Sequence, residues 1–174
     1  WAQSNVVLEN LSVKNDKSTI VIKRAEFVGA NLSKDEATKL MTSASKEEAG
    51  ELLGKLEAKQ ILIPEAVVTG EKDSIFTLRD FQATDIARGK IARLSLAGVD
   101  GAGKDDKGGA VTLKAGAITM DNLEVGGLIA ALKGGDPAAS ASKATRIASN
   151  GFELTATDKD TPADAAGGNL IKIK

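Results

Sequence analysis

Residues 19–32 (TIVIKRAEFVGANL) and residues 110–123 (AVTLKAGAITMDNL) repeat one pattern at a constant offset of 91 positions. Each stretch opens with apolar side chains at every second position, which is the period of a β-strand. Each then reaches an Asn-Leu pair and leads into a predicted helix, over residues 33–41 in the first case and 123–132 in the second. The pattern therefore predicts that one strand–helix unit occurs twice in the chain.

The two units continue to match beyond these helices. Both contain the tetrapeptide Ser-Ala-Ser-Lys, at residues 43–46 and 140–143, and both then return to an extended segment. The second unit has a longer loop and lacks most of a second helix. We therefore predict a single domain, residues 1–174, with an internal duplication. Repeat one would cover about residues 5–99 and repeat two, which can be incomplete, about residues 100–174.

Both units share an irregularity in their first strand. Ile22 and Phe27 are both large and apolar, but their odd spacing would place them on opposite faces of a regular strand. Leu113 and Ile118 in the second unit have the same spacing. A strand keeps two such residues on one face only through a bulge or a break, and Gly116 is a suitable bulge residue.

Alternating segments separated by turn signals predict the strands and the fold class. In one of them, Leu94 and Leu96 share a face while Arg93 and Ser95 share the other, which is typical of an antiparallel sheet with one solvated face. The predicted fold class is α+β: a curved, mainly antiparallel β-sheet built from two similar strand–strand–helix–strand units, with the helices packed on one face. The predicted strands cover residues 6–13, 19–28, 60–68, 74–83, 90–99, 110–120, 145–157 and 169–174.

The helix starts in the first unit carry recognisable caps. Ser33 and Glu36 fit a capping box, in which the hydroxyl and the carboxylate each satisfy a backbone N–H at the start of the helix. Ser45 and Glu48 repeat this arrangement ahead of an amphipathic stripe of aliphatic residues. These signals predict two consecutive helices between two strands.

The composition excludes several classes of function. The 174 residues include no His, Cys or Tyr, so a disulfide, a thiol nucleophile and a zinc–thiolate site are ruled out, and the commonest general base is missing. The 23 basic and 24 acidic residues give a net charge of −1, which argues against nucleic acid or an anionic membrane surface as the main partner. No apolar run reaches about 18 residues, so we expect no transmembrane segment. We expect no cofactor.

Two short motifs match parts of known catalytic sites but lack the rest. Residues 98–104 (GVDGAGK) have the spacing of a phosphate loop, yet Asp105 and Asp106 would repel phosphate and no helix follows. The Ser-x-x-Lys at residues 43–46 and 140–143 matches serine acyl-enzymes without their companion motifs. We interpret the first motif as a hairpin loop and the second as a helix cap.

Carboxylates near the end of the sequence are weak candidates for a metal site. Asp158, Asp160 and Asp164 have a spacing that can hold Ca²⁺ through oxygen ligands, but the Gly and the Glu of an EF-hand loop are missing. A solvated loop is the favoured interpretation, and we expect no metal ion.

The first residues bear on where the protein functions. Trp1-Ala2-Gln3 resembles the end of a signal-peptide cleavage site, which has small residues at a fixed spacing. We therefore expect an exported protein of the periplasm, and the alternative is an arbitrary start of the sequence. The alternating residues 169–174 either close the sheet as its last strand or belong to something longer.

Several segments run short apolar alternations into Asn-Leu or Gly turns, among them residues 6–13 (VVLENLSV), 75–99 and 110–125. In this texture the chain resembles the repetitive β regions of AsmA-like envelope proteins and of exported repeat proteins of proteobacteria. The resemblance implies a long β-sheet curled around an apolar groove and a role in lipid handling. It assigns no role to any particular residue.

The strands supply more aliphatic surface than two short helices can cover. Together with the resemblance to envelope proteins, this surplus leads us to expect a non-enzymatic exported envelope protein that binds an apolar small molecule or a lipid in a β-sheet groove. Packed core is the alternative for each candidate lining residue. These candidates are Ile61, Ile63, Phe76, Leu78, Leu94, Leu96, Val111 and Leu113.

A second hypothesis is a structural or protein–protein interaction module of the cell envelope, whose partner is another envelope protein. Duplication without a catalytic constellation favours it, because repeat architectures present extended surfaces and edge strands can recruit a partner by strand addition. An enzyme would have to rely on Asp, Glu, Lys, Ser or Thr, and a structure without a cleft of convergent polar groups would count against it.

Overall fold

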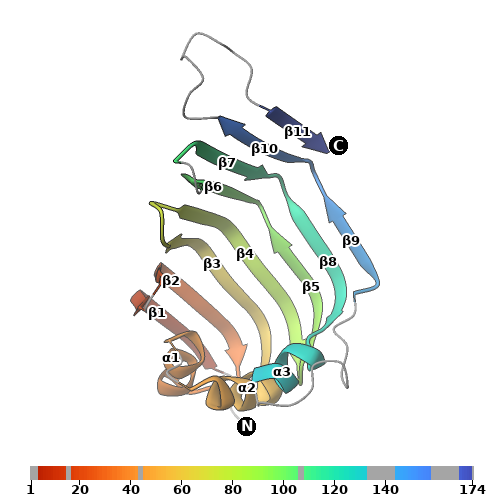
Figure 1. The fold of residues 1–174 in the computed structure, drawn as a ribbon. Helices are drawn as coiled ribbons and strands as arrows, with labels where there is room; N and C mark the ends of the chain where they lie inside the picture. The colour runs from red at the N-terminus through yellow and green to blue at the C-terminus, as the bar shows by residue number, and fades with distance from the viewer. Residues whose placement is uncertain are drawn as a thin grey trace.

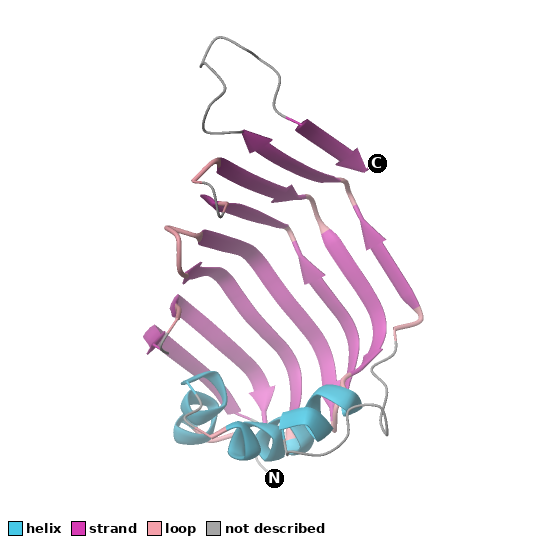
Figure 2. Ribbon diagram, in the orientation of Figure 1, coloured by secondary structure: helices cyan, strands magenta, loops and turns pink. Residues whose placement is uncertain are grey.

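A single curved sheet dominates the computed structural model. Within the residues that it describes, eleven strands pair antiparallel, and three helices lie together at one end of the sheet (Figure 1). The strands bend as they cross the molecule, so the sheet is open and curved (Figure 2). The predicted α+β class and the mainly antiparallel sheet are therefore confirmed. The described residues are 4–14, 17–42, 45–105, 108–132, 144–157 and 169–173.

The chain runs back and forth across the sheet. Its first elements are β1 (Ser4–Lys14), β2 (Thr19–Ala30), α1 (Lys34–Thr42), α2 (Lys46–Lys55), β3 (Glu57–Thr69) and β4 (Ile75–Ala87). The others are β5 (Lys90–Leu96), β6 (Gly98–Lys104), β7 (Ala110–Ala115), β8 (Ile118–Glu124), α3 (Gly126–Leu132), β9 (Arg146–Ser149), β10 (Phe152–Thr157) and β11 (Asn169–Ile173). In space the order is β1-β2-β3-β4-β6-β7-β10-β11, with β5 between β4 and β8, and β9 beside β8.

Three of the predicted strands are each two shorter strands in line. The pairing register stays the same on both sides of each interruption. For example, β4 pairs with β5 before residue 97, where Gln82 lies opposite Ser95, and with β6 after it, where Arg79 lies opposite Gly98. The predicted irregularity at Gly116 is present, but it is a break rather than a bulge, because the pairing register is the same on both sides of residues 116–117. The segments concerned are 90–99, 110–120 and 145–157, interrupted at residue 97, residues 116–117 and residues 150–151.

Helices α1 and α2 begin at the predicted caps. Ser33 Oγ accepts a hydrogen bond from the Glu36 backbone N–H at 3.2 Å, and the Ser33 N–H donates to Glu36 Oε2 at 2.8 Å. This exchange completes the capping box of α1. The Ser45 side chain accepts from the Glu48 N–H at the start of α2.

Helix α3 begins later than predicted. It starts at Gly126 rather than at Leu123, because β8 continues through Glu124, which pairs with Lys90 of β5. Pairing with a neighbouring strand therefore prevails over the local apolar pattern that favoured a helix.

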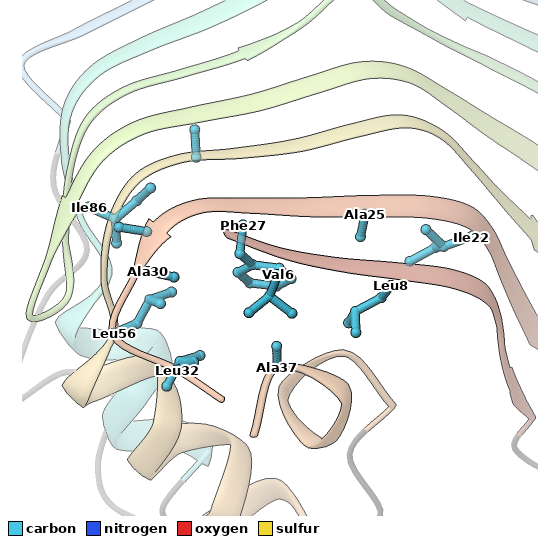
Figure 3. Close-up of a cluster of buried hydrophobic side chains, with 12 residues drawn as sticks. Val6, Leu8, Ile22, Ala25, Phe27, Ala30, Leu32, Ala37, Leu56 and Ile86 are labelled. Atoms are coloured by element: carbon cyan, nitrogen blue, oxygen red, sulfur yellow. The ribbon is translucent and has the colours of Figure 1, made fainter. Parts of the chain in front are cut away.

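The hydrophobic core lies between the sheet and helices α1 and α2 (Figure 3). Its largest fully buried side chains are Phe27, Leu8 and Leu56. In the part of the chain that the structure describes, every buried residue of this cluster is apolar and no charged or polar residue is buried. Burial of apolar surface therefore stabilises this end of the sheet. The other members of the cluster are Val6, Ile22, Ala25, Ala30, Leu32, Ala37, Ala58, Ala83 and Ile86.

The long strands change their alternation at two levels: Ala83 and Ile86 of β4 both contact the core across one step, and a second step lies farther from the helices. At this second step, Leu8 and Leu11 of β1 both contact the core although they are three positions apart, and the same holds for Ile22 and Ala25 of β2. Two consecutive residues between them must then both lie on the opposite face of the sheet. We call the face that carries the core the inner face and the opposite one the outer face.

The two-residue steps farther from the helices form a continuous line across the sheet, which we call the crease. The pairing registers place the step of each strand opposite the step of its neighbour. Asn10, Asp80 and Gly151 within it have φ values of 55°, 50° and 89°, a conformation that few residues other than glycine, Asn and Asp adopt. The crease consists of residues 9–10, 23–24, 64–65, 79–80, 97–98, 116–117 and 150–151.

The outer face carries ion pairs between neighbouring strands, together with exposed apolar residues such as Val21 and Ile75. Lys23 Nζ lies 3.2 Å from Glu65 Oε1, and Arg79 Nη2 lies 2.7 Å from Asp100 Oδ2. These side chains are solvent-exposed, so each pair contributes little to stability.

Candidate apolar binding face

The inner face continues past the crease, away from the helices, which cover only one end of the sheet (Figure 1). There its residues lie side by side on β3, β4, β6 and β7: Val68 pairs with Phe76, Phe76 with Gly101, and Gly101 with Leu113. Residues that pair directly share a face, so these positions form one surface. We call it the open face; its members are Val68, Phe76, Leu78, Val99, Gly101, Gly103, Val111 and Leu113.

The open face contains a hollow of about 190 Å³. Its floor is the backbone of β6, where Gly101 and Gly103 bring no side chain to the inner face. Phe76, Val111 and Leu113 form its apolar walls. Two glycines at alternate positions of one strand therefore create a depression between larger neighbours.

Phe76 sets the shape of this hollow. Its ring leans over the neighbouring strand, and a Cβ added to Gly101 would lie 2.7 Å from two of its ring carbons. A side chain at Gly101 would therefore displace the ring. Phe76 is still 39% exposed, so one side of the ring remains available to a ligand.

A charged pair lies at the mouth of the hollow. Lys104 Nζ is 2.6 Å from Asp73 Oδ2, across the turns that join β3 to β4 and β6 to β7. The hydrogen bond and the opposite charge raise the pKa of Lys104 and lower the pKa of Asp73. Water screens this exposed pair, so an incoming anion can compete with Asp73 for the ammonium group.

A second and larger cavity, of about 620 Å³, lies at the helical end of the sheet. Leu32 and Leu52 give it an apolar wall, while Glu36 and Lys55 bring charges to it. Arg88 also lines it, with Nε bonded to Glu57 Oε1 at 3.1 Å. Charges of both signs therefore line this cavity.

Four of the eight predicted lining residues lie on the open face. Phe76, Val111 and Leu113 line the hollow together, and Leu78 lies next to Phe76 on the same face of β4. The structure thus brings residues from two distant parts of the sequence into one surface.

The other four predicted lining residues lie at the helical half of the inner face. Ile61 and Ile63 pack against the hydrophobic core, so the alternative of packed core holds for this pair. Leu96 is buried and Leu94 half-buried on β5. None of these four lines the hollow.

Sequence reasoning missed the floor of the hollow. Gly101 and Gly103 lie in residues 98–104, for which the sequence favours a hairpin loop, whereas the segment is strand β6. That interpretation is wrong, because the segment continues as a paired strand to Lys104, which lies opposite Ala110 of β7. The alternation of Val99, Gly101 and Gly103 was the available signal, and it was hidden by the small size of glycine.

Several other candidates fall outside the described residues. These are Asp158, Asp160 and Asp164, and the tetrapeptide at 140–143. Where the structure does describe the chain, no group of three or more carboxylates converges to hold a metal ion.

Two further findings concern the length of the helices and the similarity of the chain to known proteins. No helix in the described ranges is both long enough and apolar enough to cross a bilayer. Comparison with protein-family models, with curated proteins and with solved structures finds no match to this chain.

Proposed function

We propose that this chain is a non-enzymatic envelope protein that holds an apolar small molecule or a lipid against the open face. The observation that carries the proposal is the chemistry of that face. Four neighbouring strands present only apolar residues and glycines inward, at the end of the sheet away from the helices. Apolar patches of this kind mark interaction sites in proteins that are otherwise soluble.

The dimensions of the open face suit an alkyl chain. Neighbouring strands lie about 4.8 Å apart, so four strands span roughly 15 Å. Eight methylene groups laid across them would gain about 6 kcal/mol at roughly 0.8 kcal/mol each. This gain is of the same order as the roughly 8 kcal/mol that corresponds to a micromolar dissociation constant.

The mouth of the hollow favours an amphiphile over a plain hydrocarbon. Lys104 lies at the edge of the apolar surface, where its ammonium group can meet an anionic head group. A fatty acid or another anionic lipid would then place its chain over Gly101 and Gly103 and its head group near Lys104.

A matched pair of variants tests the proposal. Leu113→Glu places a carboxylate on the open face, whereas Thr112→Glu places the same group on the exposed outer face of the same strand. With a fluorescent fatty acid as the probe, we expect saturable binding to the unmodified chain and to Thr112→Glu, and at least a tenfold loss for Leu113→Glu, because a buried charge is costly. Circular dichroism confirms that both variants fold.

Native mass spectrometry of protein purified from its host provides an independent measurement. We expect a co-purified lipid mass. A clean mass of the unliganded chain, together with no uptake of the fluorescent fatty acid, would contradict the proposed function.

The proposal also covers location and origin. We propose that the protein functions in the periplasm and that its two units arose by duplication. In support, β2 and β3 flank α1 and α2 as antiparallel neighbours, and β8 and β9 flank α3 in the same way. In the first unit the crease follows Ile22 directly, at residues 23–24. In the second unit it begins three residues after Leu113, at residues 116–117, so the two copies would have diverged there.

An interaction module is the second candidate function. The observation that favours it is the free edge of the sheet at β1, which pairs with β2 alone among the described strands.

A further inference from the structure

Strand β1 forms a long edge of the sheet. It has 11 residues, contains no proline, and pairs on one side with β2 over nearly its whole length. Within the described ranges, no strand lies on its other side. An edge of this length presents a row of backbone N–H and C=O groups that a further strand can use.

The crease restricts which strand can pair there. Throughout the sheet, the two-residue step of one strand faces the step of the next, so that inner residues meet inner residues on both sides of the crease. A strand added to β1 must carry a step of its own opposite Glu9 and Asn10. A strand without such a step would place its apolar residues on the inner face on one side of the crease only. On the other side of the crease the same residues would lie on the outer face.

Strand β1 itself meets this requirement. Its inner residues are Val6 and Leu8 before the step and Leu11 and Val13 after it. An antiparallel copy with Glu9 opposite Asn10 places Leu8 opposite Leu11, and Val6 opposite Val13, in both halves of the interface. This register also keeps the two steps opposite each other, as they are between β1 and β2.

We propose that two copies of this chain associate through their β1 strands, antiparallel and in this register, to form a twofold dimer with one continuous sheet. The occupant of the edge is a second copy because the pattern on β1 is complementary to itself, which a twofold interface requires. The dimer joins the inner faces of the two sheets and does not depend on a bound ligand.

The outer face of the same interface supplies a charge test. In the proposed register, Val7 of one copy lies opposite Ser12 of the other. Within one chain Val7 instead pairs with Glu26 and Ser12 with Val21. Substituting both positions with lysine therefore creates two like-charge contacts that exist only in the dimer. The variant with Val7→Lys and Ser12→Glu is the matched control, since it creates two opposite-charge contacts at the same positions.

The experiment measures molar mass by light scattering coupled to gel filtration over a range of micromolar concentrations. We expect twice the monomer mass for the unmodified chain and for Val7→Lys with Ser12→Glu, and the monomer mass for Val7→Lys with Ser12→Lys. A monomer at all concentrations would overturn the proposal. A dimer that survives the double-lysine substitution would place the interface elsewhere.

A distance measurement tests the register and does not depend on the double variants. The chain has no cysteine, so Ser12→Cys provides a single site for a spin label. In the proposed register the two Ser12 positions are offset by five residues, or roughly 18 Å at about 3.4 Å per residue with strands about 4.8 Å apart. A backbone separation far from this value, or no dipolar coupling between labels, would overturn it.

Discussion

Asp80 allows the crease to be tested energetically. Its φ of 50° lies in the left-handed region, which costs an ordinary L-residue roughly 1–2 kcal/mol and is least favourable for β-branched side chains. Asp80 is exposed, so its replacement removes no buried contact. We therefore expect Asp80→Val to lower the free energy of unfolding by about 1–2 kcal/mol, whereas Asp80→Gly is neutral or stabilising because glycine adopts positive φ freely.

Gln82→Val is the matched control for this substitution. Gln82 is an exposed outer-face residue two positions further along β4, and its φ is not positive. Valine favours strands, so this change should be neutral or stabilise the sheet by less than about 1 kcal/mol. The two valine variants thus differ only in the backbone conformation that each must adopt.

Urea unfolding followed by far-ultraviolet circular dichroism measures the difference. With a slope of about 2 kcal/mol per molar urea, a loss of about 1.5 kcal/mol moves the midpoint down by roughly 0.7 M. Equal midpoints for Asp80→Val and Gln82→Val would refute the reasoning, because the left-handed conformation would then not be imposed by the sheet.

Three further substitutions test the core, a cap and a turn. Phe27→Ala should destabilise the fold by about 3–5 kcal/mol in urea unfolding, since Phe27 is 1% exposed and fills the centre of the core. The hydrogen bonds from Ser33 lower the pKa of Glu36 in the folded state. That stabilisation is present above the unfolded pKa of roughly 4.3 and is lost as the pH falls through the folded value, so stability measured from pH 6 to pH 3 should fall more for the unmodified chain than for Glu36→Gln. Gly89→Ala should cost more than about 1 kcal/mol in thermal unfolding, because Gly89 has a φ of 78° and its Cβ would lie 2.9 Å from Ile129 Cδ1; an unchanged melting temperature would show that this turn relaxes freely.

Local sequence patterns predicted most of the secondary structure. The alternation in residues 19–28 and the capping box at Ser33 and Glu36 depend on neighbours within a few positions, and both match the structure. Helix α3 was placed too early, because the strand pairing of Leu123 and Glu124 with β5 involves residues far away in the sequence.

The candidate binding face could be predicted only in part. Apolar alternation indicated Phe76, Val111 and Leu113, which line the hollow together, since a large side chain at every second position is visible in the sequence. It could not separate these residues from Ile61 and Ile63, which have the same pattern but lie under the helices. The difference depends on how far two short helices reach across the sheet.

The amino-acid order by itself determined the antiparallel strands, the helix caps and the separation of an apolar face from a charged one, because periodicity and capping act over a few residues. Only the tertiary structure decided the crease, the floor of the hollow at Gly101 and Gly103, and which apolar residues the helices leave uncovered. Each of these arises where strands distant in sequence are aligned side by side, and the energy of that alignment belongs to the whole sheet rather than to any one segment.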